Sequence, residues 1–74
     1  MTKMAIQNVL ASTNGKLRLR IRRTTGWDEW QVVWLENVTG VFHRNEAKTY
    51  YTDDLEDAVQ TRETMLQIYE ETGE

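Results

Sequence analysis

The chain has 74 residues, a formal net charge of −3 and no cysteine. A domain of this size buries only about 60% of the surface that its unfolded chain exposes, and the lack of cysteine excludes disulfides and thiolate zinc sites. No apolar run approaches the roughly 18 residues that a membrane span requires, and polar residues interrupt the N-terminal stretch too early for a signal-peptide core. We therefore expect residues 1–74 to form one small, soluble, cytoplasmic domain without membrane contact.

The two ends of the chain carry opposite charge. Residues 1–52 hold eight basic and four acidic side chains, a net charge of +4. Residues 53–74 hold eight acidic side chains and one basic one, a net charge of −7. Such asymmetry predicts a surface divided into a basic and an acidic pole, which bears on partners rather than on the fold.

The first elements in chain order are predicted to form a β-hairpin. Residues 4–11 fit a strand or a short helical turn, and the Asn14-Gly15 pair that follows favours the strand. Asn-Gly suits a two-residue type I′ turn, because both central positions of that turn need positive φ. Such a turn would join residues 5–12 to a second strand over residues 16–23.

Charge and apolarity alternate along this second strand. Successive side chains of a strand point to opposite faces of the sheet. The apolar set is therefore predicted to enter the core, and it consists of Leu17, Leu19 and Ile21. The basic set is predicted to form a cationic row on the other face, and it consists of Lys16, Arg18, Arg20 and Arg22.

The next strand is predicted over residues 29–36, which are rich in aromatic and β-branched types. One face of it carries Trp30, Val32 and Trp34, and the other carries Gln31, Val33 and Leu35. Two interpretations of the tryptophan pair stay open: it fills the core under a helix, or it stands on an open face and stacks on bases or contacts a protein. Trp27, in the preceding turn, is expected to be partly exposed.

Two shorter strands and a helix complete the predicted fold. Residues 41–43 and 47–52 fit strands, with turns over residues 37–40 and 44–46. Apolar residues then repeat at helical spacing, which predicts a helix over residues 53–71.

The predicted helix has recognisable ends. Thr52 or Asp53 would cap its N-terminus, Asp53 and Glu56 have the spacing of a capping box, and Gly73 would end it. The sequence thus predicts an α+β fold, in which an antiparallel sheet of three to four strands is packed on one face by a single long C-terminal helix. The other face of the sheet stays open.

The motifs of common catalytic and cofactor sites are missing from the sequence. It has no nucleophile elbow, no phosphate-cradling glycine loop and no spacing of metal ligands, and His43 is its single histidine. We therefore expect no enzyme activity, no cofactor and no metal.

The cationic row is the main candidate for function, because arginine offers forked donors and a permanent charge to phosphates. The first hypothesis is a non-enzymatic domain that binds DNA or RNA through the open sheet face. The contacting residues would be Lys16, Arg18, Arg20, Arg22 and Arg23. The alternatives are cross-strand ion pairs with Glu29, Glu36 or Glu46, or a solvated edge strand.

The second hypothesis is a protein-interaction module or a homodimer. Its basis is the apolar character of residues 29–36 on both sides, together with the acidic surface of the predicted helix. The interaction surface would be formed by Trp27, Trp30 and Trp34.

The order of elements resembles the small sheet-plus-helix DNA-binding domains at the N-termini of phage-type integrases and in AP2-like factors. The likeness covers about residues 16–70 and is carried by the cationic strand 16–23, the Trp-containing strand 29–36 and the run Lys-Thr-Tyr-Tyr-Thr at 48–52. It implies DNA contacts from Arg18, Arg20 and Arg22, with Trp30 and Trp34 as the aromatics of the neighbouring strand. The layout is also similar to small phage-encoded regulators, including some anti-CRISPR proteins, which implies a protein partner.

Overall fold

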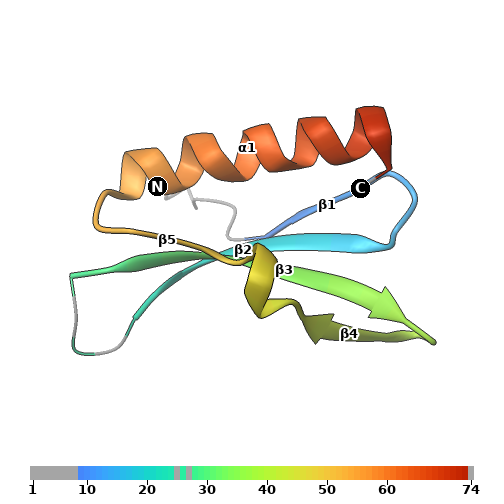
Figure 1. Ribbon diagram of the computed structural model, residues 1–74, viewed down its shortest axis with the longest axis horizontal. Coiled ribbons are helices and arrows are strands. Elements are labelled where there is room, and N and C mark those ends of the chain that lie inside the picture. The colour runs from blue at the N-terminus through green and yellow to red at the C-terminus, as the bar shows by residue number, and fades with distance from the viewer. Residues whose placement is uncertain (1–8, 25, 27, 74) are drawn as a thin grey trace, which may run out of the picture.

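A computed structural model describes residues 9–24, 26 and 28–73. These residues form one antiparallel sheet with one long helix packed on it, so the α+β prediction is confirmed (Figure 1). The elements in chain order are β1 (Val9–Ala11), β2 (Leu17–Arg23), β3 (Trp30–Val38), β4 (Val41–Arg44), a 3₁₀ turn η1 (Glu46–Lys48), β5 (Tyr50–Thr52) and α1 (Leu55–Thr72). Within the described ranges, no helix combines the length and apolarity that crossing a membrane takes.

The sheet is built around β3. The strand β2 pairs with β3 over residues 30–36, and β1 pairs with the other edge of β2. The second edge of β3 is shared, because β5 pairs with residues 30–32 and β4 pairs with residues 35–38. Between these two pairings, the Trp34 carbonyl accepts from the Asn45 N–H at 2.8 Å and the Trp34 N–H donates to Thr49 Oγ1 at 3.4 Å. The sheet is therefore four strands wide although five strands build it.

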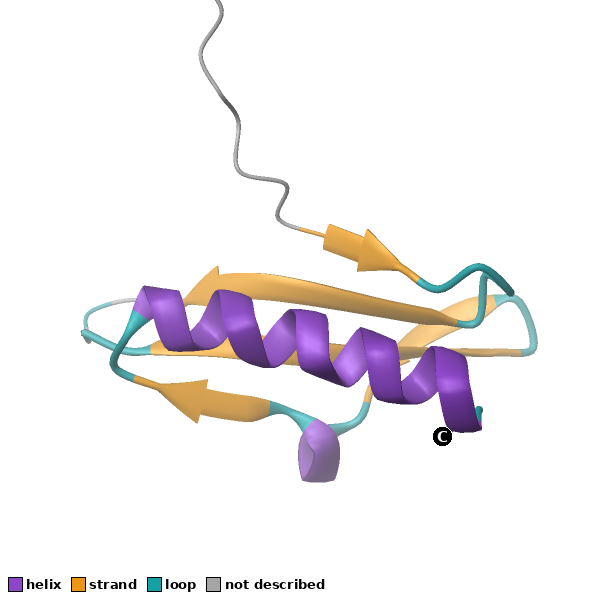
Figure 2. Cartoon of the chain, turned by 90° about the horizontal axis from the view of Figure 1, so that it is seen from above, coloured by secondary structure: helices purple, strands orange, loops and turns teal. Residues whose placement is uncertain are grey.

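The helix lies across one face of the sheet, as Figure 2 shows from above. Leu17, Leu19 and Ile21 of β2 are buried under it, and the arginines between them are exposed. The remaining buried members of this core are Val32, Trp34 and Ala58, with partly buried Trp30, Leu55, Val59, Met65, Leu66 and Tyr69 packed against them. The predicted split of β2 is confirmed, and the tryptophan pair follows the first of its two interpretations by facing the helix.

The loop between β1 and β2 differs from the predicted turn. The Ser12 N–H donates to the Leu17 carbonyl at 2.9 Å, so four residues separate this pair and a two-residue type I′ turn at Asn14-Gly15 is wrong. Gly15 has a φ of 75°, but Asn14 has no positive φ. The Asn14 carboxamide oxygen instead accepts from Ser12 Oγ and from the Lys16 N–H, which holds the longer loop.

A turn with positive φ at both central positions occurs between β3 and β4. Thr39 has a φ of 55° and Gly40 a φ of 87°, as a type I′ turn requires. β3 consequently runs two residues further than predicted, through Asn37 and Val38.

The last strand is shorter than predicted, and the helix has a different cap. Residues 47 and 48 belong to η1, and only Tyr50–Thr52 pair with β3. The helix is capped by Asp54, whose side chain accepts from the Glu56 N–H at 3.0 Å, so a cap by Thr52 or Asp53 is wrong. Gly73 ends the helix as predicted, with a φ of 78°. Residues 4–8 of the first predicted strand lie outside the described residues.

Candidate nucleic-acid interface

The face of the sheet opposite the helix carries the arginines of β2. Arg18, Arg20 and Arg22 are all exposed there. Their partners across the β2–β3 pairing are Leu35, Val33 and Gln31 respectively. On the open face, a row of cations therefore lies beside uncharged side chains of β3. The tryptophans of β3 lie on the opposite face of the sheet, against the helix.

These three guanidiniums make no ion pair with any carboxylate of the described chain. The two ion pairs found in that part join Arg23 to Asp28 and Arg44 to Glu46, each at 2.8 Å. Cross-strand pairing of the row with acidic neighbours, one of the alternatives from the sequence, is therefore wrong for these residues. The reason is register, since Glu36 stands opposite Leu17 on the helix side of the sheet.

Apolar side chains lie directly beside the arginine row. Val33, opposite Arg20, is 4% exposed although no helix covers this face. The Arg18 guanidinium carbon lies 4.0 Å from the centroid of the Phe42 ring, a cation–π contact that reaches from β2 across β3 to β4. The arginine stems thus cover part of the apolar surface of β3 while their charged ends remain exposed.

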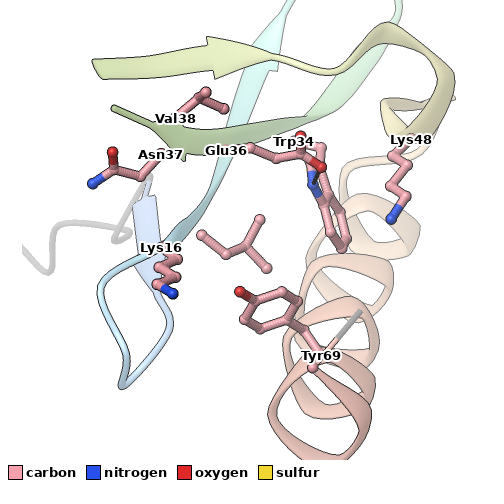
Figure 3. A pocket seen from close by; sticks show the side chains of 9 residues that line it. Lys16, Trp34, Glu36, Asn37, Val38, Lys48 and Tyr69 are labelled. Carbon is pink, nitrogen blue, oxygen red and sulfur yellow. Dashed lines mark hydrogen bonds between the residues drawn. The ribbon is translucent and has the colours of Figure 1, made fainter. Parts of the chain in front are cut away.

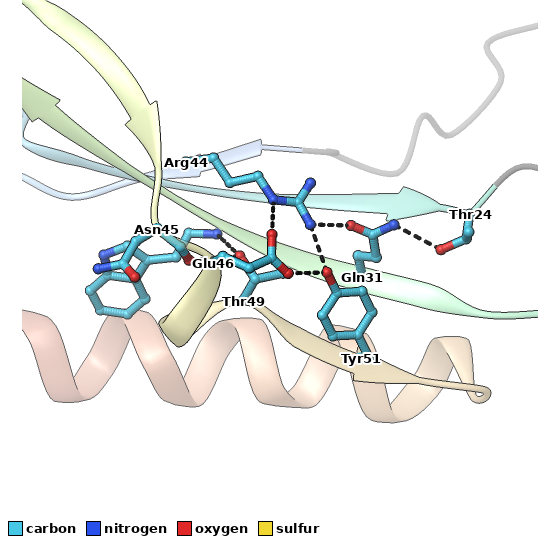
Figure 4. Close-up of polar contacts among 8 residues, drawn as sticks. Thr24, Gln31, Arg44, Asn45, Glu46, Thr49 and Tyr51 are labelled. Carbon is cyan, nitrogen blue, oxygen red and sulfur yellow. Dashed lines mark hydrogen bonds and ion pairs between the residues drawn. The ribbon is translucent and has the colours of Figure 1, made fainter.

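A network of polar side chains lies on the open face across β3 from the arginine row (Figure 4). The Arg44 guanidinium donates to Glu46 Oε1, Gln31 Oε1 and the Tyr51 hydroxyl, each at 2.8 Å. The Tyr51 hydroxyl in turn donates to Glu46, and Gln31 Nε2 donates to Thr24 Oγ1 at 2.7 Å. These contacts tie β4, η1 and β5 to β3, and they leave the Arg44 charge already matched by a carboxylate.

The network perturbs the acidity of its members. The hydrogen bond from Tyr51, with that from Arg44, lowers the pKa of Glu46 below its ordinary value. The Tyr51–Glu46 hydrogen bond also raises the pKa of the Tyr51 phenol. The Arg44–Glu46 hydrogen bond raises the pKa of Arg44. Each shift favours an ionised Glu46 carboxylate between a protonated Tyr51 phenol and a charged Arg44 guanidinium.

The structure separates the other predicted site residues from the row. Arg23 stands opposite Trp30 on the helix side and pairs with Asp28, with its guanidinium carbon 5.8 Å from the Trp30 ring centroid. Lys16 precedes β2 and lines a pocket on the helix side. Trp34 is 5% exposed in the core, and Trp27 lies outside the described residues.

That pocket lies between the C-terminal half of α1 and the ends of β2 and β3 (Figure 3). Its volume is about 310 Å³, and Lys16, Lys48, Trp34 and Tyr69 are among its lining residues. The Tyr69 ring meets the Trp34 indole edge-on at a centroid distance of 6.0 Å, and Lys48 Nζ lies 4.7 Å from the indole centroid. The indole N–H donates to Glu36 at 2.8 Å, so this carboxylate is already satisfied.

The sequence pattern did not single out three open-face residues, Phe42, Arg44 and Tyr51. A usable signal exists, because Phe42 and Arg44 are two apart and must share a face of their strand. Which face they share depends on the pairing of Leu35 with Arg44. The register between β3 and β4 depends on contacts between distant residues, so it cannot be deduced from the pattern within one strand.

Among the described residues, no group of three or more histidine, aspartate or glutamate side chains is arranged to hold a metal ion. The arrangement of the open face fits the binding of an anion by charge and hydrogen bonds. Comparison of the chain with protein-family models, with curated proteins and with solved structures found no match in any of the three.

Proposed function

We propose that this protein is a non-enzymatic nucleic-acid-binding domain that contacts phosphates through the open face of its sheet. The observation that carries the proposal is the row of Arg18, Arg20 and Arg22, three exposed guanidiniums without a carboxylate partner in the described chain. By contrast, Arg23 is paired with Asp28 and Arg44 with Glu46. A row of positive charges without carboxylate partners attracts a polyanion.

The geometry of the row suits a phosphate backbone. Side chains two apart on a strand repeat at about 6.7 Å, which is comparable to the separation of consecutive phosphates in an extended nucleic-acid strand. Guanidinium gives each phosphate a forked pair of donors. The acidic residues of α1 lie on the other side of the sheet, so a phosphate backbone meets the cations first.

The test is binding of fluorescent oligonucleotides by the wild type and by a triple variant, Arg18→Gln, Arg20→Gln and Arg22→Gln. Three phosphate contacts predict a slope of about −2.1 to −2.7 for log K against log salt concentration, or roughly a 20- to 40-fold loss between 50 and 200 mM salt. The triple variant is expected to bind with a slope near zero.

A matched control removes the same charge elsewhere. Lys16→Gln, Arg23→Gln and Lys48→Gln together take three cations from outside the open face and should leave the salt slope unchanged. The proposal fails if the wild type binds no oligonucleotide at about 50 mM salt, or if the control variant loses as much affinity as the open-face variant.

Protein interaction is the second candidate function, and exposed apolar residues beside the pocket favour it. Val38 is 49% exposed and lines the pocket, its strand partner Val41 is 56% exposed, and Ile68 of α1 is 49% exposed. A second copy of the chain could cover this surface. Light scattering after size exclusion, over a wide range of concentration, would then give a dimer that Val38→Ser with Val41→Ser dissociates. A wild type that stays monomeric throughout rules out the homodimer.

A further inference from the structure

We infer that the open face takes a single strand of nucleic acid, DNA or RNA, in preference to a duplex. This inference rests on the proposed function and adds the class of ligand. Three features of the open face carry it: the number of cation rows, the state of Arg44, and the position of the aromatic side chains relative to the row.

The described open face offers one row of available cations. A duplex presents two backbones across a groove, about 12 Å apart in the major groove of B-DNA. The next cation on this face is Arg44, two strands from the row and thus about 9.6 Å away. Its guanidinium is already bonded to Glu46, Gln31 and Tyr51. A second backbone would therefore find no unmatched charge among the described side chains of this face.

The aromatic residues stand to one side of the row. Phe42 of β4 lies beyond β3 from the arginines, and so does Tyr51 of β5, which pairs with Gln31 and is 41% exposed. A strand whose phosphates follow β2 can lay its bases across β3 towards the Tyr51 ring and towards the Arg18 guanidinium that covers Phe42. In a duplex the bases are stacked on each other and paired, so they cannot make this contact.

Arg18 supplies a platform for such a base. Its guanidinium carbon lies 4.0 Å from the centroid of the Phe42 ring, and Arg18 is an exposed residue. Bases stack on guanidinium planes as well as on aromatic rings. Phe42 would hold the guanidinium in place from below while a base covers it from above.

The experiment compares three ligands of about 10 nucleotides, a length within the range of known single-strand sites. They are oligo-dT, oligo-U and a DNA hairpin whose stem pairs the same oligo-dT with oligo-dA, each followed by fluorescence anisotropy at one salt concentration. We expect the single strands to bind about 5- to 150-fold more tightly than the duplex for each base that stacks. Equal or tighter binding of the duplex overturns the inference and leaves the proposed function standing, whereas no binding of any ligand overturns the proposed function itself. Preference for oligo-U or oligo-dT identifies the source of the strand.

Two charge-conserving variants test the platform. Arg18→Lys keeps the charge and removes the guanidinium plane, so it is expected to lose about fivefold or more in single-strand affinity with an unchanged salt slope. Arg20→Lys, the matched control, has Val33 rather than an aromatic residue beside it and should lose less. Equal behaviour of the two variants means that no base stacks on Arg18, and far-UV circular dichroism verifies that both are folded.

Discussion

Replacement of Trp34 by alanine tests whether this residue belongs to the core or to a binding surface. The side chain is 5% exposed, meets Tyr69 edge-on and donates its indole N–H to Glu36. Truncation of a buried tryptophan to alanine costs about 3–5 kcal/mol. A domain of 74 residues has a total stability of about 4–11 kcal/mol, so this one change removes a large share of it.

The measurement is urea unfolding followed by circular dichroism, with the midpoint rather than the slope expected to change. The same loss corresponds to a Tm lower by about 20–30 °C for a domain of this length. Trp34→Phe keeps a ring against Tyr69 and removes the donor to Glu36, so it should cost less, about 1–3 kcal/mol. This milder variant keeps the prediction measurable if the alanine variant does not fold.

A control on the same strand separates burial from strand propensity. Val38 is 49% exposed, and Val38→Ala is expected to change stability by no more than about 0.5 kcal/mol. The reasoning is refuted if Trp34→Ala costs less than about 1 kcal/mol, because a tryptophan that fills the core cannot be removed so cheaply.

Three further predictions concern the turn and the titrating groups. Thr39→Asn should stabilise the protein by roughly 0.5–1 kcal/mol in urea unfolding, because asparagine tolerates the φ of 55° better than a β-branched residue, and a loss of stability contradicts this. Hydrogen bonds to carboxylates raise the pKa of Tyr50 and Tyr51 above 10.0. The stability that these bonds contribute is therefore present below about pH 10 and is lost as the pH rises through the raised values. An absorbance titration that finds both phenols at their unfolded pKa contradicts this. The bond from Tyr51 lowers the pKa of Glu46 below 4.5, so the contribution of Glu46 is present above pH 4.5 and is lost as the pH falls through the lowered value. Glu46→Gln should therefore flatten the acid side of a stability–pH curve, and a curve that matches the wild type would show the bond to be unimportant.

The sequence was sufficient for the parts of the fold that depend on local periodicity. The alternation in Leu17–Arg23 predicted which side chains of β2 are buried, because successive residues of a strand point to opposite faces of the sheet. The helical repeat and Gly73 likewise predicted the helix and its end. The row of Arg18, Arg20 and Arg22 follows from the same alternation, so the centre of the candidate interface was also predictable.

The remainder depended on contacts between distant residues. Glu36 and Glu46 were open as partners of the arginine row until the register placed Glu36 opposite Leu17 and the Arg44 guanidinium took Glu46. The prediction of a turn at Asn14-Gly15 was wrong because Asn14 does not adopt the positive φ that this turn needs. Its side-chain oxygen instead accepts hydrogen bonds within a longer loop. Three-residue β5 is fixed by its pairing to β3, and so short a strand has no periodic signature of its own.

The placement of the helix between the acidic residues and the basic face has a consequence for how far each charge is felt. A sheet and a packed helix are together roughly 15 Å thick, whereas the Debye length is about 8 Å at physiological ionic strength. A phosphate on Arg20 is then electrostatically separated from Glu63 on the outer side of α1, and the net charge of −3 does not repel it. In millimolar salt the Debye length grows to about 30 Å and both faces act at once. Affinity for a polyanion would thus pass through a maximum as salt is lowered, at the ionic strength where the ligand begins to sense the far side of the molecule.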